Sequence, residues 1–200
     1  MKRLGTALLG LLALTSTAAR ADDFGLSPAL QLGQIASGGS GCPGGDTVRA
    51  AYDSVTGQVN VQFLAFRPEA TSRDPGLKRQ SCDLALPMSP PAGYALRIVD
   101  IAMPVSTLLE QGTTSQAHLE AFLAGSTGPQ DSQNFESPAG TVIRRTVLGG
   151  RVGITSGCGE SVNVRVNASA IASNSADPAA YAAIAIRSAQ LHLAFIPCSQ

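Results

Sequence analysis

Apolar and polar residues alternate along two stretches of the chain. In residues 58–66, polar positions separate the apolar side chains of Val59, Val61 and Phe63, and residues 161–172 repeat this alternation over a longer span. Alternation with a period of two puts the apolar side chains on one face of a strand, which is typical of a strand with one face in the core. Both stretches are therefore predicted to be half-buried β-strands.

Weaker patterns of the same kind predict further strands, and segments rich in glycine, proline and serine predict the turns between them. The weaker strands cover residues 47–52, 82–88, 94–103, 117–123, 141–148 and 185–196. The turn-rich segments are residues 38–46, 68–76, 89–93, 125–140 and 173–178. Two short helices are predicted at residues 105–111, where Gly112 would end the helix, and at residues 178–183.

Short strands separated by turns at this spacing indicate a mainly-β fold in which a single domain forms an antiparallel β-sandwich. A jelly-roll and an immunoglobulin-like arrangement both fit the pattern, with one or two short helices added. We expect the sandwich to occupy residues 40–200, and residues 22–39 to form a flexible N-terminal segment.

The first 21 residues have the three-part pattern of a secretory signal peptide. A lysine and an arginine form a positive start, residues 4–14 are an apolar run, and small residues precede a predicted cleavage between Ala21 and Asp22. The run is shorter than the roughly 20 apolar residues that a membrane-spanning helix needs, and no later segment reaches that length. We therefore expect a secreted or periplasmic protein with no membrane span after signal removal.

The charge of the chain excludes nucleic acids as partners, and its aromatic content limits binding by stacking. The chain has 14 basic and 14 acidic residues, and cleavage would remove three basic ones, which leaves a net charge of −3. Proteins that bind nucleic acids carry a basic patch or stripe, so no nucleic-acid partner is expected. Tryptophan is absent and aromatic residues make up 4% of the chain, so few side chains are available for stacking on sugars or bases.

Four cysteines, Cys42, Cys82, Cys158 and Cys198, follow the predicted signal peptide. An even number of cysteines in an exported chain predicts disulfides, here two of them, and three pairings are possible. The spacing favours Cys42 with Cys82 and Cys158 with Cys198, because 40 residues separate the members of each pair and each bond would tie one half of the chain. No two cysteines lie close together in the sequence, so a metal site is not expected.

No segment carries a specific catalytic or cofactor-binding motif. Gly39, Gly41 and Gly44 fit the dinucleotide pattern G-x-G-x-x-G, but this segment leads into a strand rather than a helix, which indicates a loop. His118 and His192 each lie within a strand pattern. The acidic residues are scattered, at Asp83, Asp100, Glu110, Glu120 and Glu136. We therefore predict no catalytic residue, no cofactor and no metal ligand, although the members of a serine–histidine–aspartate set meet only in space.

The segments around the cysteines follow one another in a distinctive order. SGCPGGDTV at residues 40–48 and QVNVQFLAF at 58–66 come first, residues 79–94 carry RQSCDLALPM and PAGY, and SGCGESVNVRVNASA at 156–170 and LHLAFIPC at 191–198 follow. This order resembles DUF4360, a family of secreted bacterial and fungal proteins of unknown function. The resemblance implies the fold, export and the same pairing of cysteines, and it implies no catalytic residue.

Together these observations favour a non-enzymatic extracytoplasmic module that binds a cell-surface glycan or protein, or that has a structural role at the cell envelope. The alternative is a secreted hydrolase or an inhibitor of one, in which a histidine or an acid would meet a serine or threonine on loops at one end of the sandwich. A polar cleft that holds His118 or His192 beside an acid would favour the hydrolase. A sandwich with no cleft would favour the binding module.

Overall fold

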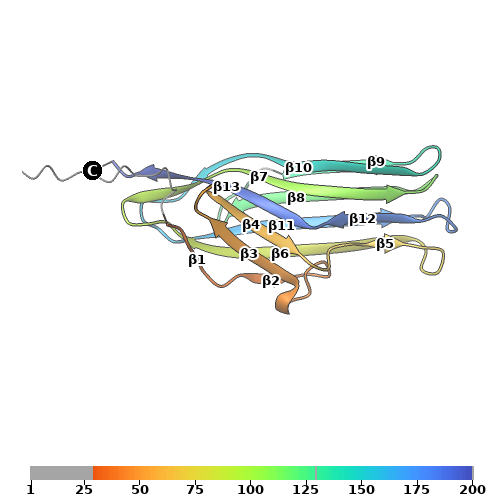
Figure 1. The fold of residues 1–200 in the computed structure, drawn as a ribbon, viewed down its shortest axis with the longest axis horizontal. Coiled ribbons are helices and arrows are strands. Elements are labelled where there is room, and N and C mark those ends of the chain that lie inside the picture. The colour runs from red at the N-terminus through yellow and green to blue at the C-terminus, as the bar shows by residue number, and fades with distance from the viewer. Residues whose placement is uncertain (1–28, 129, 200) are drawn as a thin grey trace, which may run out of the picture.

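The computed structural model describes residues 29–128 and 130–199 of the chain. Within this part, thirteen strands form two sheets that lie face to face, with all strand pairs antiparallel (Figure 1). The predicted signal peptide and its cleavage site lie outside the described residues. No helix in the described part is long and apolar enough to cross a membrane.

The six-stranded sheet has the order β1-β6-β11-β8-β9, and β2 also pairs with β6. Its strands are β1 (Gln31–Leu32), β2 (Ala36–Gly38), β6 (Leu77–Ser89), β8 (Thr114–Leu123), β9 (Gln130–Glu136) and β11 (Val162–Ser173). Strand β11 is central, because it pairs with β6 along one edge and with β8 along the other. Strands β1 and β2 fall within residues 22–39 and lie along β6.

The seven-stranded sheet is built around β7, the longest strand of the described part. Its strands are β3 (Val48–Asp53), β4 (Gln58–Phe63), β5 (Glu69–Ala70), β7 (Tyr94–Leu109), β10 (Val142–Thr155), β12 (Ala182–Ile186) and β13 (Ser188–Pro197). Strands β12 and β13 follow one another along one edge of β7, and β10 pairs with its other edge. Strand β4 pairs with β13 and carries β3, while β5 pairs with β12.

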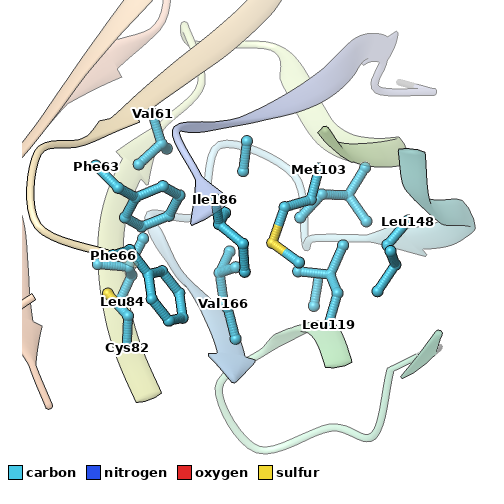
Figure 2. Close-up of a cluster of buried hydrophobic side chains, with 14 of the residues drawn as sticks. Val61, Phe63, Phe66, Cys82, Leu84, Met103, Leu119, Leu148, Val166 and Ile186 are labelled. Atoms are coloured by element: carbon cyan, nitrogen blue, oxygen red, sulfur yellow. The ribbon is translucent and has the colours of Figure 1, made fainter. Parts of the chain in front are cut away.

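The core lies between the two sheets and follows from the alternation in the sequence. In β11, Val164 and Val166 are buried while the residues between them face outward, and the same holds for Val59 and Val61 in β4. Figure 2 shows side chains from both sheets meeting in this core, among them Leu119 of the six-stranded sheet. Burying one such side chain contributes about 1.5–3 kcal/mol.

The structure confirms the mainly-β sandwich and corrects several details of the prediction. Residues 105–109 continue β7, and residues 178–183 form a turn followed by the start of β12, so neither predicted helix exists. A three-residue 3-10 turn, Gly45–Thr47, is the helical element of the described part. Strand β9 lies inside residues 125–140, which were predicted to be a turn-rich segment.

The first predicted helix fails because its residues pair with distant strands. Val105 and Leu109 are one helical turn apart, but they are both buried because they lie on the inner face of β7, where they are paired with Ile186 and Ala182 of β12. Hydrogen bonding to a distant strand thus overrides a local pattern that is compatible with a helix. The predicted strand at residues 185–196 is also interrupted, at Arg187.

Candidate functional site

The four cysteines form the two pairs that the spacing favours. Cys42 and Cys82 are bonded with their Cα atoms 5.3 Å apart, and Cys158 and Cys198 are bonded with Cα atoms 5.9 Å apart. The two bonds differ in environment, because Cys42 and Cys82 are both 0% exposed while Cys158 lies at the surface. The first bond ties the segment before β3 to the middle of β6, and the second ties the end of β13 to the loop before β11.

The two histidines lie on opposite sheets. His192 of β13 stands directly across from Asp100 of β7, and its Nδ1 atom hydrogen-bonds to the aspartate. His118 of β8 hydrogen-bonds through Nδ1 to the hydroxyl of Ser132 on β9, at 2.8 Å. No described serine or threonine hydroxyl hydrogen-bonds to His192. The described residues therefore bring a histidine and an acid together without a serine or threonine bonded to the histidine.

A break in the strand register positions the most distinctive polar residue of the outer surface, Arg187. On the β7 side, residues 187–189 lie opposite only residues 103–104, because Ile186 pairs with Val105 and Gln190 with Ala102. The register also shifts on the β4 side, where residues 63–65 lie opposite Arg187. Bulges of this kind redirect side chains, and here the result is an exposed arginine between two buried strand segments.

A second arginine is placed beside the first by the segment that joins β4 to β5. The amide of Ile186 donates to the carbonyl of Phe66 at 3.0 Å, and the amide of Ile184 donates to that of Pro68 at 3.2 Å. Phe66 and Pro68 are buried, so Arg67 between them points outward, next to Ala185 of β12. Diagonal neighbours on adjacent strands lie about 7–8 Å apart, so Arg67 and Arg187 share one patch of surface.

The two arginines have different partners. Arg67 forms an ion pair through Nε with Glu69 and donates through Nη2 to the phenol oxygen of Tyr181, at 3.2 Å. Burial raises the pKa of the Tyr181 phenol above its usual range, so this group stays neutral at physiological pH. No described residue forms a hydrogen bond or an ion pair with the Arg187 guanidinium. The two arginines therefore carry two positive charges, of which one is paired with the carboxylate of Glu69.

Two hollows adjoin at these arginines and form what we call the two-arginine groove. The first, of about 490 Å³, is lined by Arg67, Ser106, Thr107, Leu108, Ile143, Ala183, Ala185 and Arg187. The second, of about 570 Å³, is lined by Gln62, Phe63, Leu64, Phe66, Arg67, Ala185, Ile186, Arg187 and Ser188. Among these described lining residues none is acidic. Leu64 and Ile143 expose 62% and 72% of their surface, so each hollow has an apolar wall.

The groove contains neither histidine, so it is not the polar cleft that would favour a hydrolase. A third hollow, of about 310 Å³, lies on the six-stranded sheet and also lacks them. Two of its polar side chains are already paired, because Gln116 donates to Asn134 at 2.9 Å. The described residues contain no group of three or more histidine, cysteine, aspartate or glutamate side chains that could hold a metal ion. The two-arginine groove is thus the best candidate for a binding site.

Comparison with known proteins places the chain in a family. The family model "Domain of unknown function (DUF4360)" matches residues 28–198, which includes both sheets and all four cysteines. The chain belongs to the DUF4360 family. No curated protein matches this DUF4360 domain.

Among solved structures, one match to the DUF4360 domain is TmCBM61 in complex with β-1,4-galactotriose. It has 11% sequence identity and a TM-score of 0.27, and it covers 87% of this chain and 92% of that chain. Values this low do not transfer a fold or a ligand from one protein to the other.

The residues of the two-arginine groove were not predicted from the sequence. Their signal was weak but present, because Arg67 and Arg187 each interrupt a run of apolar and small residues, LAFRP and AAIAIRSA. A lone arginine in such a run is compatible with an ordinary solvated side chain. Its proximity to a second arginine depends on the pairing of β12 with a segment more than a hundred residues away, which composition and periodicity do not reveal.

Proposed function

We propose that this DUF4360 domain is an extracytoplasmic, non-enzymatic binding module and that its two-arginine groove binds an anionic ligand. The observation that carries this proposal is the Arg187 guanidinium, which lies between two adjoining hollows without a counter-charge among the described residues. Arginine presents a planar fork of donors that matches a carboxylate, sulfate or phosphate, so the groove supplies the group that an anion requires.

The surroundings of the arginines support binding rather than a solvated surface charge. Glu69 and Tyr181 hold Arg67 on one edge, so this side chain loses less conformational entropy when it meets a ligand. The exposed side chains of Leu64 and Ile143 offer apolar contact on either side. A small number of charged groups set in a mainly apolar hollow is the usual composition of a ligand site.

Placement outside the cytoplasm is supported by the two disulfides together with the predicted signal peptide. Disulfides form and persist in oxidising compartments, and a buried bond such as Cys42–Cys82 contributes to folding there. A secreted or a periplasmic location agrees with these features.

The secreted hydrolase remains a second candidate because of one observation, the hydrogen bond between His192 and Asp100. A histidine oriented by an aspartate is part of the arrangement that activates a serine. Binding is preferred because no described serine or threonine hydroxyl hydrogen-bonds to His192. A His192→Ala variant that abolished a measured hydrolytic activity would establish the second candidate.

Binding measurements with the purified mature protein test the main proposal. Isothermal titration would compare a hexasaccharide of alternating glucuronate and N-acetylglucosamine, a hexaglutamate peptide, and the neutral hexamer of N-acetylglucosamine. At least one anionic probe should bind, and Arg187→Gln should weaken it about tenfold, which corresponds to one lost charge-assisted pair. Arg79→Gln, which changes an exposed arginine of β6 on the other sheet, should leave binding unchanged.

Salt dependence provides an independent measurement on the same samples. Binding through an exposed guanidinium should weaken as the salt concentration rises, because mobile ions screen the attraction. The proposal is wrong if neither anionic probe binds, or if Arg187→Gln and Arg79→Gln bind as tightly as the parent protein.

A further inference from the structure

We infer that the ligand of the two-arginine groove is an internal stretch of an acidic glycan, with one acidic sugar at the arginines and neutral sugars in the hollows on either side. This inference rests on the proposed function and adds the class and the orientation of the ligand. It follows from the position of the two arginines in the groove, from the backbone and polar groups that line the groove, and from the net charge of the whole domain.

The positive charges stand in the middle of the groove rather than at its end. The two hollows have only Arg67, Ala185 and Arg187 in common, and their other lining residues differ. Ser106 and Ile143 belong to the first hollow, on the side of β7 and β10. A ligand with a terminal acid would fill one hollow, whereas a chain with an acid between other units fills both.

The floor of the groove favours a glycan over an acidic peptide. Ala183 and Ala185 lie in β12, which is paired with β7 along one edge and with β5 and residues 66–68 along the other. Its backbone donors and acceptors are therefore already used. An extended peptide binds best where it can add to a free strand edge, because its own amides and carbonyls need partners. A glycan has no such backbone requirement.

The remaining polar groups of the groove suit sugar hydroxyls. Ser106 in the first hollow, and Gln62 and Ser188 in the second, are neutral and each lines only one of the two hollows. Hydroxyl and amide groups both donate and accept hydrogen bonds, as sugar hydroxyls do. Leu64 and Ile143 provide apolar surface for the carbon-bound hydrogens of a sugar ring. Each hollow lies within the range of about 300–1,000 Å³ that holds a small-molecule ligand.

The charge of the domain limits how acidic the glycan can be. The chain without its predicted signal peptide carries a net charge of −3, and the groove has two arginines against one glutamate. A polymer with a charge on every unit would be repelled by the rest of the surface. A glycan in which neutral sugars separate the acidic ones places one acid at Arg187 and avoids this repulsion.

The test compares ligand length and blocks each hollow separately. Titrations would use free glucuronate, the hexasaccharide of alternating glucuronate and N-acetylglucosamine, and hexaglutamate. Ser106→Trp fills the first hollow and Ser188→Trp fills the second, while Gln116→Trp on the outer face of β8 is the matched control. Ile143→Ala and Leu64→Ala remove exposed apolar walls without touching the core, and they replace the tryptophan variants if those do not fold.

The hexasaccharide should bind at least about tenfold more tightly than free glucuronate, because contacts in both hollows add to the central one. Each hollow variant should weaken binding of the hexasaccharide by a larger factor than binding of glucuronate, and the control should change neither. Equal affinity for hexasaccharide and glucuronate, tighter binding of hexaglutamate, or loss on blocking only one hollow would overturn the inference while Arg187-dependent anion binding stands. If no anion binds, the proposed function fails as well.

Discussion

Removing the two disulfides one at a time separates two contributions to stability. One is the entropy that the bond removes from the unfolded chain, and the other is the packing of its sulfur atoms in the folded protein. Both bonds close a loop between cysteines 40 residues apart, so the entropy that each removes from the unfolded chain is the same, about 4 kcal/mol at 25 °C. The variants are the double substitutions Cys42→Ala/Cys82→Ala and Cys158→Ala/Cys198→Ala. Any difference between them reports on the folded state.

The structure predicts that removing the buried bond lowers the free energy of unfolding more than removing the exposed bond does. Cys42 and Cys82 are both 0% exposed and belong to the core cluster, so replacing them by alanine leaves a void where two sulfur atoms were. A void of methyl size costs about 1 kcal/mol, which adds about 2 kcal/mol for the two sulfurs. We expect a total loss of about 6 kcal/mol for the buried pair and about 4 kcal/mol for the exposed pair.

Urea unfolding followed by circular dichroism gives both values by linear extrapolation, and it does not require tryptophan, which the chain lacks. The exposed bond should also be the first to be reduced by a mild reductant, as shown by trapping and mapping free thiols. An unfolded buried-pair variant beside a folded exposed-pair variant agrees with the expected order. Equal losses, or a larger loss for Cys158→Ala/Cys198→Ala, would refute the packing argument.

Three further predictions concern single positions. Burial raises the pKa of the Tyr181 phenol in the folded state. The stability that this group contributes is therefore complete below its pKa in the unfolded chain and is lost as the pH rises through its pKa in the folded protein. Tyr181→Phe should reduce the loss of stability at alkaline pH, measured by urea titration. Asn174 is 0% exposed, accepts from the Gly76 amide at 2.7 Å and donates to two carbonyls, so Asn174→Ala should lower the free energy of unfolding by about 3 kcal/mol. Asn174→Asp should lower it by at least as much, because its carboxylate would face the two carbonyl oxygens in a buried site. Gly149→Ala would bring a Cβ atom against a backbone carbonyl oxygen of β7 and should lower the melting temperature by several degrees more than Gly140→Ala, where positive φ is the only cost. Similar melting temperatures for these two glycine variants would contradict the last prediction.

Strands with one buried face could be predicted from the sequence because their apolar and polar residues alternate with the buried and exposed faces. Strand β11 shows this, since its inner residues are valine and alanine and its outer ones are mostly polar. Strand β9 was missed because it pairs only with β8 at the edge of its sheet and buries a single large apolar residue, Phe135, so its sequence has no alternation to read. The extended backbone of residues 105–109 was missed because its partners lie in β10 and β12.

The candidate site was less predictable than the fold, for a related reason. Cysteine spacing identified the disulfides because both members of a disulfide are cysteines, and their positions can be read from the sequence. No single residue type or spacing in the sequence identifies the two-arginine groove. It exists because the register shifts at Arg187 bring residues 63–68 beside the end of β12, and a register shift is a property of paired strands rather than of either strand alone.

The position of β13 determines when folding can be completed. This strand comes after all other described strands in the chain, yet it lies inside the seven-stranded sheet, paired with β4 on one side and with β7 on the other. The parts of that sheet that are synthesised earlier cannot join until residues 188–197 are available. Until then, the edges of β4 and β7 that pair with β13 have no partner. Contacts between residues so distant in sequence form slowly, so the growing chain remains unfolded for longer than its length alone suggests. A chain that must cross a membrane before it folds would benefit from this delay.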